Sequence, residues 1–299
     1  MSLRISKPGK HALVVETPVM NAAGVLGFGD SYRDLFDFSA MGAFVTNPIT
    51  YGPWSPASGT RVIPLPSGVL VHTGLPNPGV SKVLGAYRDL WKRLPVPVIA
   101  HVVAHSPEDM SMAIRMLERE ESVAAIELGL ADDISTAEVE WYVRAAVGRG
   151  EKPILARLFH GASADHARAA IEAGAGGVVA FAPPRGTARD GRGRLTAGRL
   201  YGPMVKPMTL RLVGQLARRL PGVAIIASGG VHSEQDARDY IEAGAAAVQV
   251  DAAIWSMPRI VEHIGKDLGG LSLTRPVGMD DEMFALFMNK SSDDPEAES

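Results

Sequence analysis

The sequence of 299 residues contains no cysteine. This absence excludes disulfides, thiolate metal ligands, an iron–sulfur cluster held by the chain itself and a cysteine nucleophile. The chain also lacks a basic surplus, because 30 Lys and Arg stand against 33 Asp and Glu, so we expect no nucleic-acid partner. It lacks an apolar run near the roughly 18 residues of a membrane span, and its first apolar run is too short for a signal peptide. These absences predict a cytoplasmic protein without a membrane partner.

Eight short apolar runs alternate with helical patterns along the chain. Most runs are continuously apolar, which is typical of parallel strands buried on both faces. The predicted strands cover residues 19–23, 42–46, 97–102, 124–128, 153–158, 177–181, 224–228 and 246–250. The predicted helices cover residues 107–120, 137–149, 164–173, 208–219 and 234–243. The pattern predicts an α/β fold, a single (β/α)8 TIM barrel. A doubly wound dinucleotide fold is the weaker alternative, since no GxGxxG motif follows the first strand.

The barrel is predicted to span residues 1–290, followed by a disordered acidic tail at 291–299. Two long connections, 48–80 and 183–206, are expected on the top face, and the second holds six basic residues and one acid, Asp190. Loops of this length are either functional lids or solvated surface loops. The sequence leaves both interpretations open.

Several helix boundaries have local signals. Ser106 and Ser233 are predicted N-caps, since a serine hydroxyl can accept a hydrogen bond from the first helical turn. Gly174 and Gly244 occur in two near-identical phrases, Ile-Glu-Ala-Gly-Ala, at the ends of helices. Glycine is the residue that most readily ends a helix in the left-handed conformation, so the chain is expected to re-enter the sheet directly after each of them.

The ends of the predicted strands contain the candidate chemistry. Ser228-Gly229-Gly230 follow the seventh strand and precede a helix, which favours phosphate binding in a barrel, although a tight turn is the alternative. Asp132 and Asp133 follow the fourth strand, and either is a candidate general base or a cap for the helix near Ser135.

Other ionisable residues lie within or just after the strands. Glu127 lies inside a strand and needs a buried partner, for which Arg157 on the next strand is the candidate; Arg157 is alternatively placed to stabilise negative charge on a cofactor ring. His101, His105 and His160 lack the HxH or HExxH spacing of metal ligands, so we predict hydrogen-bonding roles and no metal.

Seven phrases in order along residues 14–265 resemble the dihydroorotate dehydrogenase family of FMN-dependent (β/α)8 barrels. The phrases are Asn21-Ala-Ala-Gly-Val-Leu-Gly-Phe-Gly, Met41-Gly-Ala-Phe-Val-Thr-Asn-Pro-Ile-Thr, Thr73-Gly-Leu-Pro-Asn-Pro-Gly, Ala125-Ile-Glu-Leu, Tyr201-Gly-Pro-Met-Val-Lys-Pro, Ser228-Gly-Gly-Val and Ala247-Val-Gln-Val. The resemblance implies FMN over the top of the barrel. It places Ala23 and Gly24 against the isoalloxazine ring, and Asn47 and Arg157 where the family has lysines.

The resemblance also implies a set of residues around the FMN phosphate. These are Gly202, Gly229, Gly230, Asp251 and Ala252. Asp251 stands where the family has a glycine, so its side chain must point away or phosphate binding weakens.

The substrate side differs more from the family. Three residues are expected to contact substrate, namely His72, Asn77 and Phe181, and His72 and Phe181 stand where the family has asparagines. Asp132 stands at the position of the family's catalytic base, and Gly129 replaces another asparagine. Because each lost hydrogen bond costs on the order of 1–3 kcal/mol, we expect a substrate other than dihydroorotate, a small, pyrimidine-like ring.

These observations predict an FMN-dependent oxidoreductase of pyrimidine metabolism that acts on a CH–CH group. FMN N5 would accept a hydride while Asp132 takes a proton from the adjacent carbon. The absence of cysteine places any iron–sulfur relay in an electron-transfer partner subunit, and we expect a homo-oligomer, a dimer. The alternative is a non-catalytic flavin-binding or empty paralogue that acts as a partner subunit. A flavin-free lyase ranks third, since no strand end offers a Schiff-base lysine.

Overall fold

The computed structural model describes residues 3–6, 12–31, 35 and 37–273. Its central feature is an eight-stranded parallel sheet in the order β3-β14-β13-β10-β9-β8-β7-β4. The strands are β3 (Val19–Asn21), β4 (Phe44–Val45), β7 (Val98–Val103), β8 (Ala125–Gly129), β9 (Ile154–Leu158), β10 (Gly177–Ala180), β13 (Ile225–Ser228) and β14 (Ala247–Val250). A parallel bridge between Met20 and Ala43 brings the two end strands together. The predicted (β/α)8 barrel is therefore confirmed, and each predicted strand overlaps an observed one.

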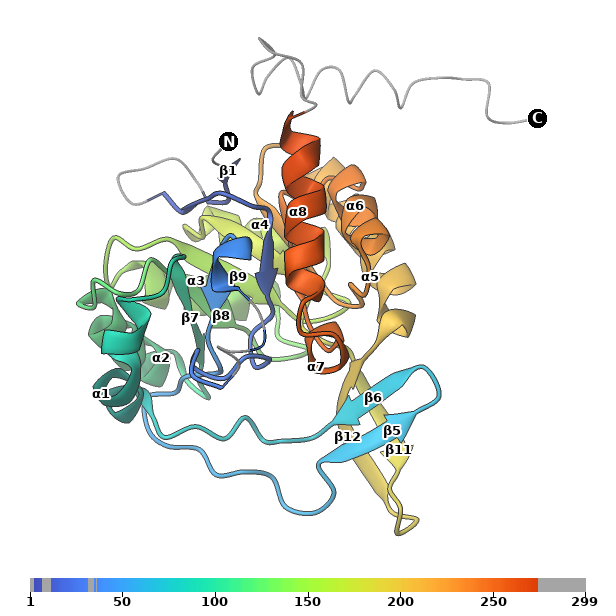
Figure 1. Cartoon of the computed structure of the whole chain (residues 1–299). Coiled ribbons are helices and arrows are strands. Elements are labelled where there is room, and N and C mark those ends of the chain that lie inside the picture. The colour runs from blue at the N-terminus through green and yellow to red at the C-terminus, as the bar shows by residue number, and fades with distance from the viewer. Residues whose placement is uncertain (1–2, 7–11, 32–34, 36, 274–299) are drawn as a thin grey trace.

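Helices surround this sheet (Figure 1). They are α1 (Val80–Trp91), α2 (Pro107–Glu118), α3 (Thr136–Val147), α4 (Ala164–Glu172), α5 (Lys206–Arg219), α6 (Glu234–Glu242), α7 (Ala253–Ser256) and α8 (Ile260–Leu273). The sequence analysis missed α1, which begins directly after the Pro- and Gly-rich segment and whose first residue follows Gly79 without a side-chain cap. Among the described helices, none combines the length and apolar character needed to cross a membrane. The predicted tail at 291–299 lies outside the described residues.

The predicted helix boundaries are confirmed by their hydrogen bonds and dihedral angles. Ser106 Oγ accepts from the Asp109 N–H at 3.2 Å, and Ser233 Oγ accepts from the Asp236 N–H at 3.1 Å. Gly174 and Gly244 have φ angles of 112° and 100°. Those angles are strained for any residue with a Cβ, which explains why both phrases need glycine.

The two long connections pair with each other instead of forming separate loops. They contribute the strands β5 (Val62–Leu65), β6 (Gly68–Val71), β11 (Arg185–Arg189) and β12 (Leu195–Tyr201) to one antiparallel sheet in the order β11-β12-β6-β5. Leu200 of β12 lies opposite Leu70 of β6. Figure 1 shows this sheet beside α7, which follows the carboxyl end of β14. The excursion therefore lies next to the end of the barrel where the strands terminate.

The barrel interior consists of an apolar layer and a polar layer. The first is an apolar cluster toward the amino ends of the strands, to which the N-terminal residues Ile5, Leu13 and Val15 also belong. Its barrel members are Met20, Val45, Ile99, Ala125, Leu155, Val179, Ile226 and Ala247. Side chains two residues apart on a strand share a face, so the residues two positions later point into the same interior. Those residues include His101, Glu127, Arg157, Ser228 and Gln249, which form the polar layer of the candidate site.

Candidate active site

The polar layer is a hydrogen-bonded cluster centred on Arg157, which we call the Arg157 cluster (His101, Glu127, Arg157, Ser228 and Gln249). Arg157 Nη1 donates to Glu127 Oε1 at 3.1 Å and to Gln249 Oε1 at 2.7 Å. Its Nη2 donates to Ser228 Oγ at 3.1 Å and to the Phe181 carbonyl at 3.3 Å. The predicted pairing of Glu127 with Arg157 is therefore confirmed, and four strands fix the guanidinium in one orientation.

Glu127 is fully buried yet remains ionised. Burial by itself raises the pKa of a carboxyl group, but the charge of Arg157 and hydrogen bonds from His101 and Gln249 outweigh it, lowering the pKa of Glu127 to about 2. His101 Nδ1 lies 2.9 Å from Glu127 Oε1, and Gln249 Nε2 donates to Oε2 at 2.6 Å. His101 therefore acts as a partner of a buried carboxylate. In the described part of the chain, no group of three His, Asp or Glu side chains is placed to hold a metal ion.

Gly129, at the end of β8, shows why this chain has no asparagine there. A Cβ at Gly129 would lie 2.7 Å from Val103 Cγ1 and 2.9 Å from His101 Cε1. Real Cβ atoms do not approach other atoms so closely, because packed interiors tolerate no such overlap. The His101 ring thus takes space that a larger residue at position 129 would need.

Asp132 forms a two-pronged ion pair with the excursion sheet. Arg199 Nη1 and Nη2 each donate to one Asp132 oxygen at 2.7 Å, and Arg185 Nε lies 3.6 Å from Oδ2. The alternative in which Asp132 or Asp133 caps the next helix is wrong, because Ser135 is the N-cap and forms a capping box with Glu138. Asp132 therefore ties the β8–α3 connection to β12.

The turns after β13 and β14, which we call the β13–β14 turns (Gly229, Gly230, Asp251 and Ala252), lie side by side. Gly230 has a φ of 72°, and a Cβ there would come within 2.5 Å of the Lys206 backbone nitrogen. Gly202 has a φ of 137°, and a Cβ there would lie 2.5 Å from the Ser67 carbonyl oxygen. These glycines therefore permit close backbone packing, while the predicted role of Gly229 and Gly230 in phosphate binding stays a prediction.

Asp251 points into these turns and not away from them. It is 2% exposed, its Oδ1 accepts from the Ala252 N–H at 2.6 Å, and the Gly230 N–H is a second donor. Burial raises the pKa of Asp251, although His232, these two N–H groups and Arg157 oppose the shift. Asp251 therefore has the orientation that was expected from the sequence to disfavour a phosphate, and its effect on phosphate binding stays a prediction.

Several strand-end residues retain unused hydrogen-bonding capacity. Asn47 Oδ1 and His160 Nε2 are buried and have no hydrogen-bond partner among the described residues. Burial lowers the pKa of His160, so its imidazole is neutral near pH 7. Ala23 and Gly24 follow β3, and Gly24 is exposed with a φ of 85°. A buried polar atom without a partner is costly, so these atoms favour a polar ligand over the strand ends.

The three predicted substrate contacts lie in two parts of the structure, one after a barrel strand and two in the long connection. Phe181 follows β10, is 1% exposed and packs edge-on against His160 with ring centroids 5.9 Å apart. Asn77 uses its amide within the long connection, where Oδ1 accepts from Thr50 Oγ1 at 2.8 Å and Nδ2 donates to the Leu75 carbonyl at 3.1 Å. His72 follows β6, and its N–H donates to the Arg61 carbonyl at 2.7 Å. Their role in substrate binding stays a prediction.

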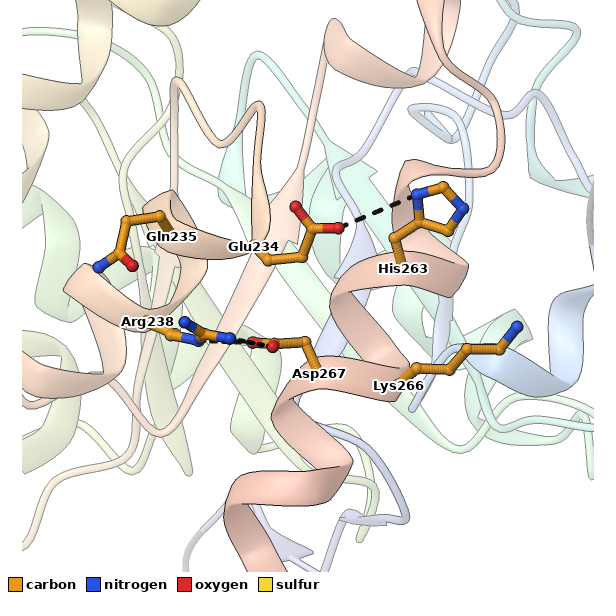
Figure 2. Close-up of a pocket in the computed structure, with 6 residues that line it drawn as sticks. All are labelled: Glu234, Gln235, Arg238, His263, Lys266 and Asp267. Atoms are coloured by element: carbon orange, nitrogen blue, oxygen red, sulfur yellow. Dashed lines mark hydrogen bonds and ion pairs between the residues drawn. The ribbon is translucent and has the colours of Figure 1, made fainter.

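A concave region lies on the outside of the barrel between α6 and α8 (Figure 2). It is lined by Glu234, Gln235, Arg238, His263, Lys266 and Asp267. Figure 2 shows that Arg238 pairs with Asp267 and that Glu234 faces His263. None of the predicted site residues lines this groove, and its charges neutralise one another, so the strand ends remain the candidate site.

Comparison with known proteins agrees with this geometry. The family described as "Dihydroorotate dehydrogenase" matches residues 11–143 and 185–271. A protein of Desulforamulus reducens named "Dihydroorotate dehydrogenase B (NAD(+)), catalytic subunit" is 31% identical over 267 residues, which cover 83% of this chain and 86% of the relative. A protein of the same name from Latilactobacillus sakei is 31% identical over 89% of this chain and 92% of the relative. The chain therefore belongs to the dihydroorotate dehydrogenase family, whose members are oxidoreductases.

Proposed function

We propose that the chain is the catalytic subunit of a dehydrogenase that removes two hydrogens from adjacent carbons of dihydroorotate and passes the electrons through a flavin to a partner subunit. The observation that carries the proposal is the similarity, over more than four-fifths of both chains, to relatives named as catalytic subunits of dihydroorotate dehydrogenase B. Those names favour dihydroorotate over the altered substrate expected from the sequence. They also disfavour the non-catalytic alternative.

The fit of FMN differs between the two ends of that molecule. A reduced flavin ring carries negative charge, which the fixed guanidinium of Arg157 suits, and the unpaired Asn47 Oδ1 and His160 Nε2 suit a polar ring edge. The phosphate end does not fit, because the Asp251 carboxylate takes the N–H groups of Ala252 and Gly230. A bound flavin would accept the hydride, and the chain's own residues would orient the substrate and take the proton.

Asp132 is the proposed base, and Arg199 controls its availability. The Arg199 guanidinium donates to both carboxylate oxygens, so Asp132 stays oriented until the pair opens. Dihydroorotate carries a carboxylate of its own, which competes with Asp132 for Arg199 and for the more exposed Arg185. Substrate binding would thereby release one Asp132 oxygen beside the ring that loses the proton.

The remaining features of the proposed assembly follow from the chain and from its relatives. The relatives are named as subunits that use NAD(+), and this chain has no cysteine for a cluster. An electron-transfer partner subunit is therefore part of the proposal. We further propose a homodimer and a cytoplasmic location, in keeping with the composition of the chain.

A dye-coupled assay of dihydroorotate oxidation, with riboflavin or FMN in excess, tests this function. Wild-type protein is expected to form orotate, and Asp132→Asn is expected to lose roughly 10²–10⁴-fold in turnover, the usual contribution of a general base. Asp133→Asn is the matched control, because it removes an adjacent carboxylate that caps no helix. Absence of turnover by the flavin-loaded wild-type protein would contradict dihydroorotate as the substrate. Equal losses in the two variants would contradict Asp132 as the base.

A further inference from the structure

We propose that the Asp251 carboxylate replaces a ligand phosphate in this barrel, so that the site accepts a flavin whose ribityl chain ends in a hydroxyl, riboflavin in preference to FMN. The inference deepens the proposed function, because it names the form of the flavin at the same site. It concerns the β13–β14 turns, where barrels of this type offer backbone N–H groups to phosphates.

Three backbone donors at this corner are already used. The N–H groups of Ala252 and Gly230 both donate to Asp251. The His232 N–H, at the start of α6, donates to Asp236 Oδ2 at 2.9 Å. Each of these donors is thus satisfied by a carboxylate of the chain itself, and a phosphate would have to displace that carboxylate.

The cations around the turns are already paired with other groups of the chain. The Lys206 ammonium donates to Asp236 Oδ1 at 2.6 Å and to Asp239 Oδ2 at 2.5 Å. Arg157 is held by Glu127, Gln249 and Ser228. The nearby cations are therefore neutralised by other groups, and a phosphate monoester, with a charge of about −1.5 to −2, would add to an unneutralised Asp251.

A neutral hydroxyl of the ligand fits the groups at this corner. A hydroxyl both donates and accepts hydrogen bonds, so it can donate to Asp251 without displacing the backbone donors. His232 faces Asp251 electrostatically, and its buried Nδ1 has no hydrogen-bond partner among the described residues. That nitrogen is a ready second partner for the hydroxyl, whereas a phosphate offers no proton to a carboxylate when fully ionised.

Titration of flavin-free protein with riboflavin and with FMN, followed by quenching of flavin fluorescence at pH 8, tests the inference. We expect wild-type protein to bind riboflavin at least tenfold more tightly than FMN. Asp251→Gly is expected to gain at least tenfold in FMN affinity and so to reverse the preference. Asp165→Asn, which removes one carboxylate from the exposed side of α4, controls for net charge and is expected to keep the wild-type preference.

Each other result counts against the inference. It is overturned if wild-type protein binds FMN as tightly as riboflavin, if Asp251→Gly leaves the preference unchanged, or if neither flavin binds to either protein. Asp251→Asn, which keeps the side-chain volume, gives the same comparison should the glycine variant fail to fold, and it should raise FMN affinity in the same direction. Oxidation of dihydroorotate by a protein that binds FMN at least as tightly as riboflavin would refute the inference but support the proposed function. A preference for riboflavin without oxidation of dihydroorotate would support the inference but contradict the proposed function.

Discussion

Two buried carboxylates at the carboxyl ends of the barrel strands have pKa values that are shifted in opposite directions. Glu127, in the Arg157 cluster, has a pKa lowered to about 2, while Asp251, in the β13–β14 turns, has a raised pKa. Both are removed from water, so burial penalises both charges. The difference is that Glu127 has a guanidinium in direct contact, whereas the hydrogen bonds to Asp251 come from two backbone N–H groups. The guanidinium in direct contact outweighs desolvation at Glu127, whereas two backbone N–H groups and the charges of His232 and Arg157 do not outweigh it at Asp251.

The comparison predicts its largest stability effect at Arg157. Arg157→Met would leave Glu127 buried without its cation, and breaking such a pair is expected to lower the free energy of unfolding by about 3–5 kcal/mol. Urea unfolding followed by circular dichroism at pH 7 measures the loss. Arg168→Met removes the partner of Asp165 in an exposed pair and should change stability by less than roughly 1 kcal/mol. Similar losses in both variants would show that the cluster is not held by its buried charge pair.

At Asp251 we predict the opposite effect, a variant that is more stable than the wild-type protein. Asp251→Asn removes an incompletely compensated buried charge, so it should raise the unfolding free energy at neutral pH by roughly 1–3 kcal/mol. The folded-state pKa of Asp251 lies above its unfolded value. The wild-type protein therefore loses stability as pH rises from the unfolded pKa to the folded one, and the variant does not.

Unfolding measured from pH 4 to pH 8 checks this second prediction. The gap between variant and wild type should open as pH rises and then stay constant. The charged and titratable groups that interact electrostatically with Asp251 are His232, Arg157, Tyr201 and Tyr240. A destabilised Asp251→Asn at pH 8 would mean that the carboxylate is fully compensated, and the contrast with Glu127 would disappear.

The smallest effect on stability is expected at Ser228, because its side chain carries no charge. Ser228→Ala removes one of the acceptors of Arg157 and should cost about 1 kcal/mol of unfolding free energy. Repeating the change in the Arg157→Met background forms a double-mutant cycle. The cost should vanish there, since the donor is gone. An unchanged cost would assign the effect of Ser228 to packing.

The contrast also shows where sequence reasoning succeeded within the site. A carboxylate inside a continuous apolar strand must find a partner, and the alternation of a strand leaves few positions that can supply one. Glu127 on β8 and Arg157 on the adjacent β9 satisfy that rule through neighbouring strands. His101 and Gln249 were not foreseen as members of the cluster, although both lie two positions after residues of the apolar layer and that spacing was available in the sequence.

The sequence by itself determined the elements that depend on local interactions. Continuous apolar runs defined the strands, serine hydroxyls began α2 and α6, and glycines ended the helices at Gly174 and Gly244. Only the tertiary structure decided the pairing of β6 with β12, the contact between Asp132 and Arg199, and the direction of Asp251. The first two join residues far apart in sequence, whose meeting depends on how the whole barrel closes. The third depends on which neighbouring backbone donors surround the carboxylate after its burial.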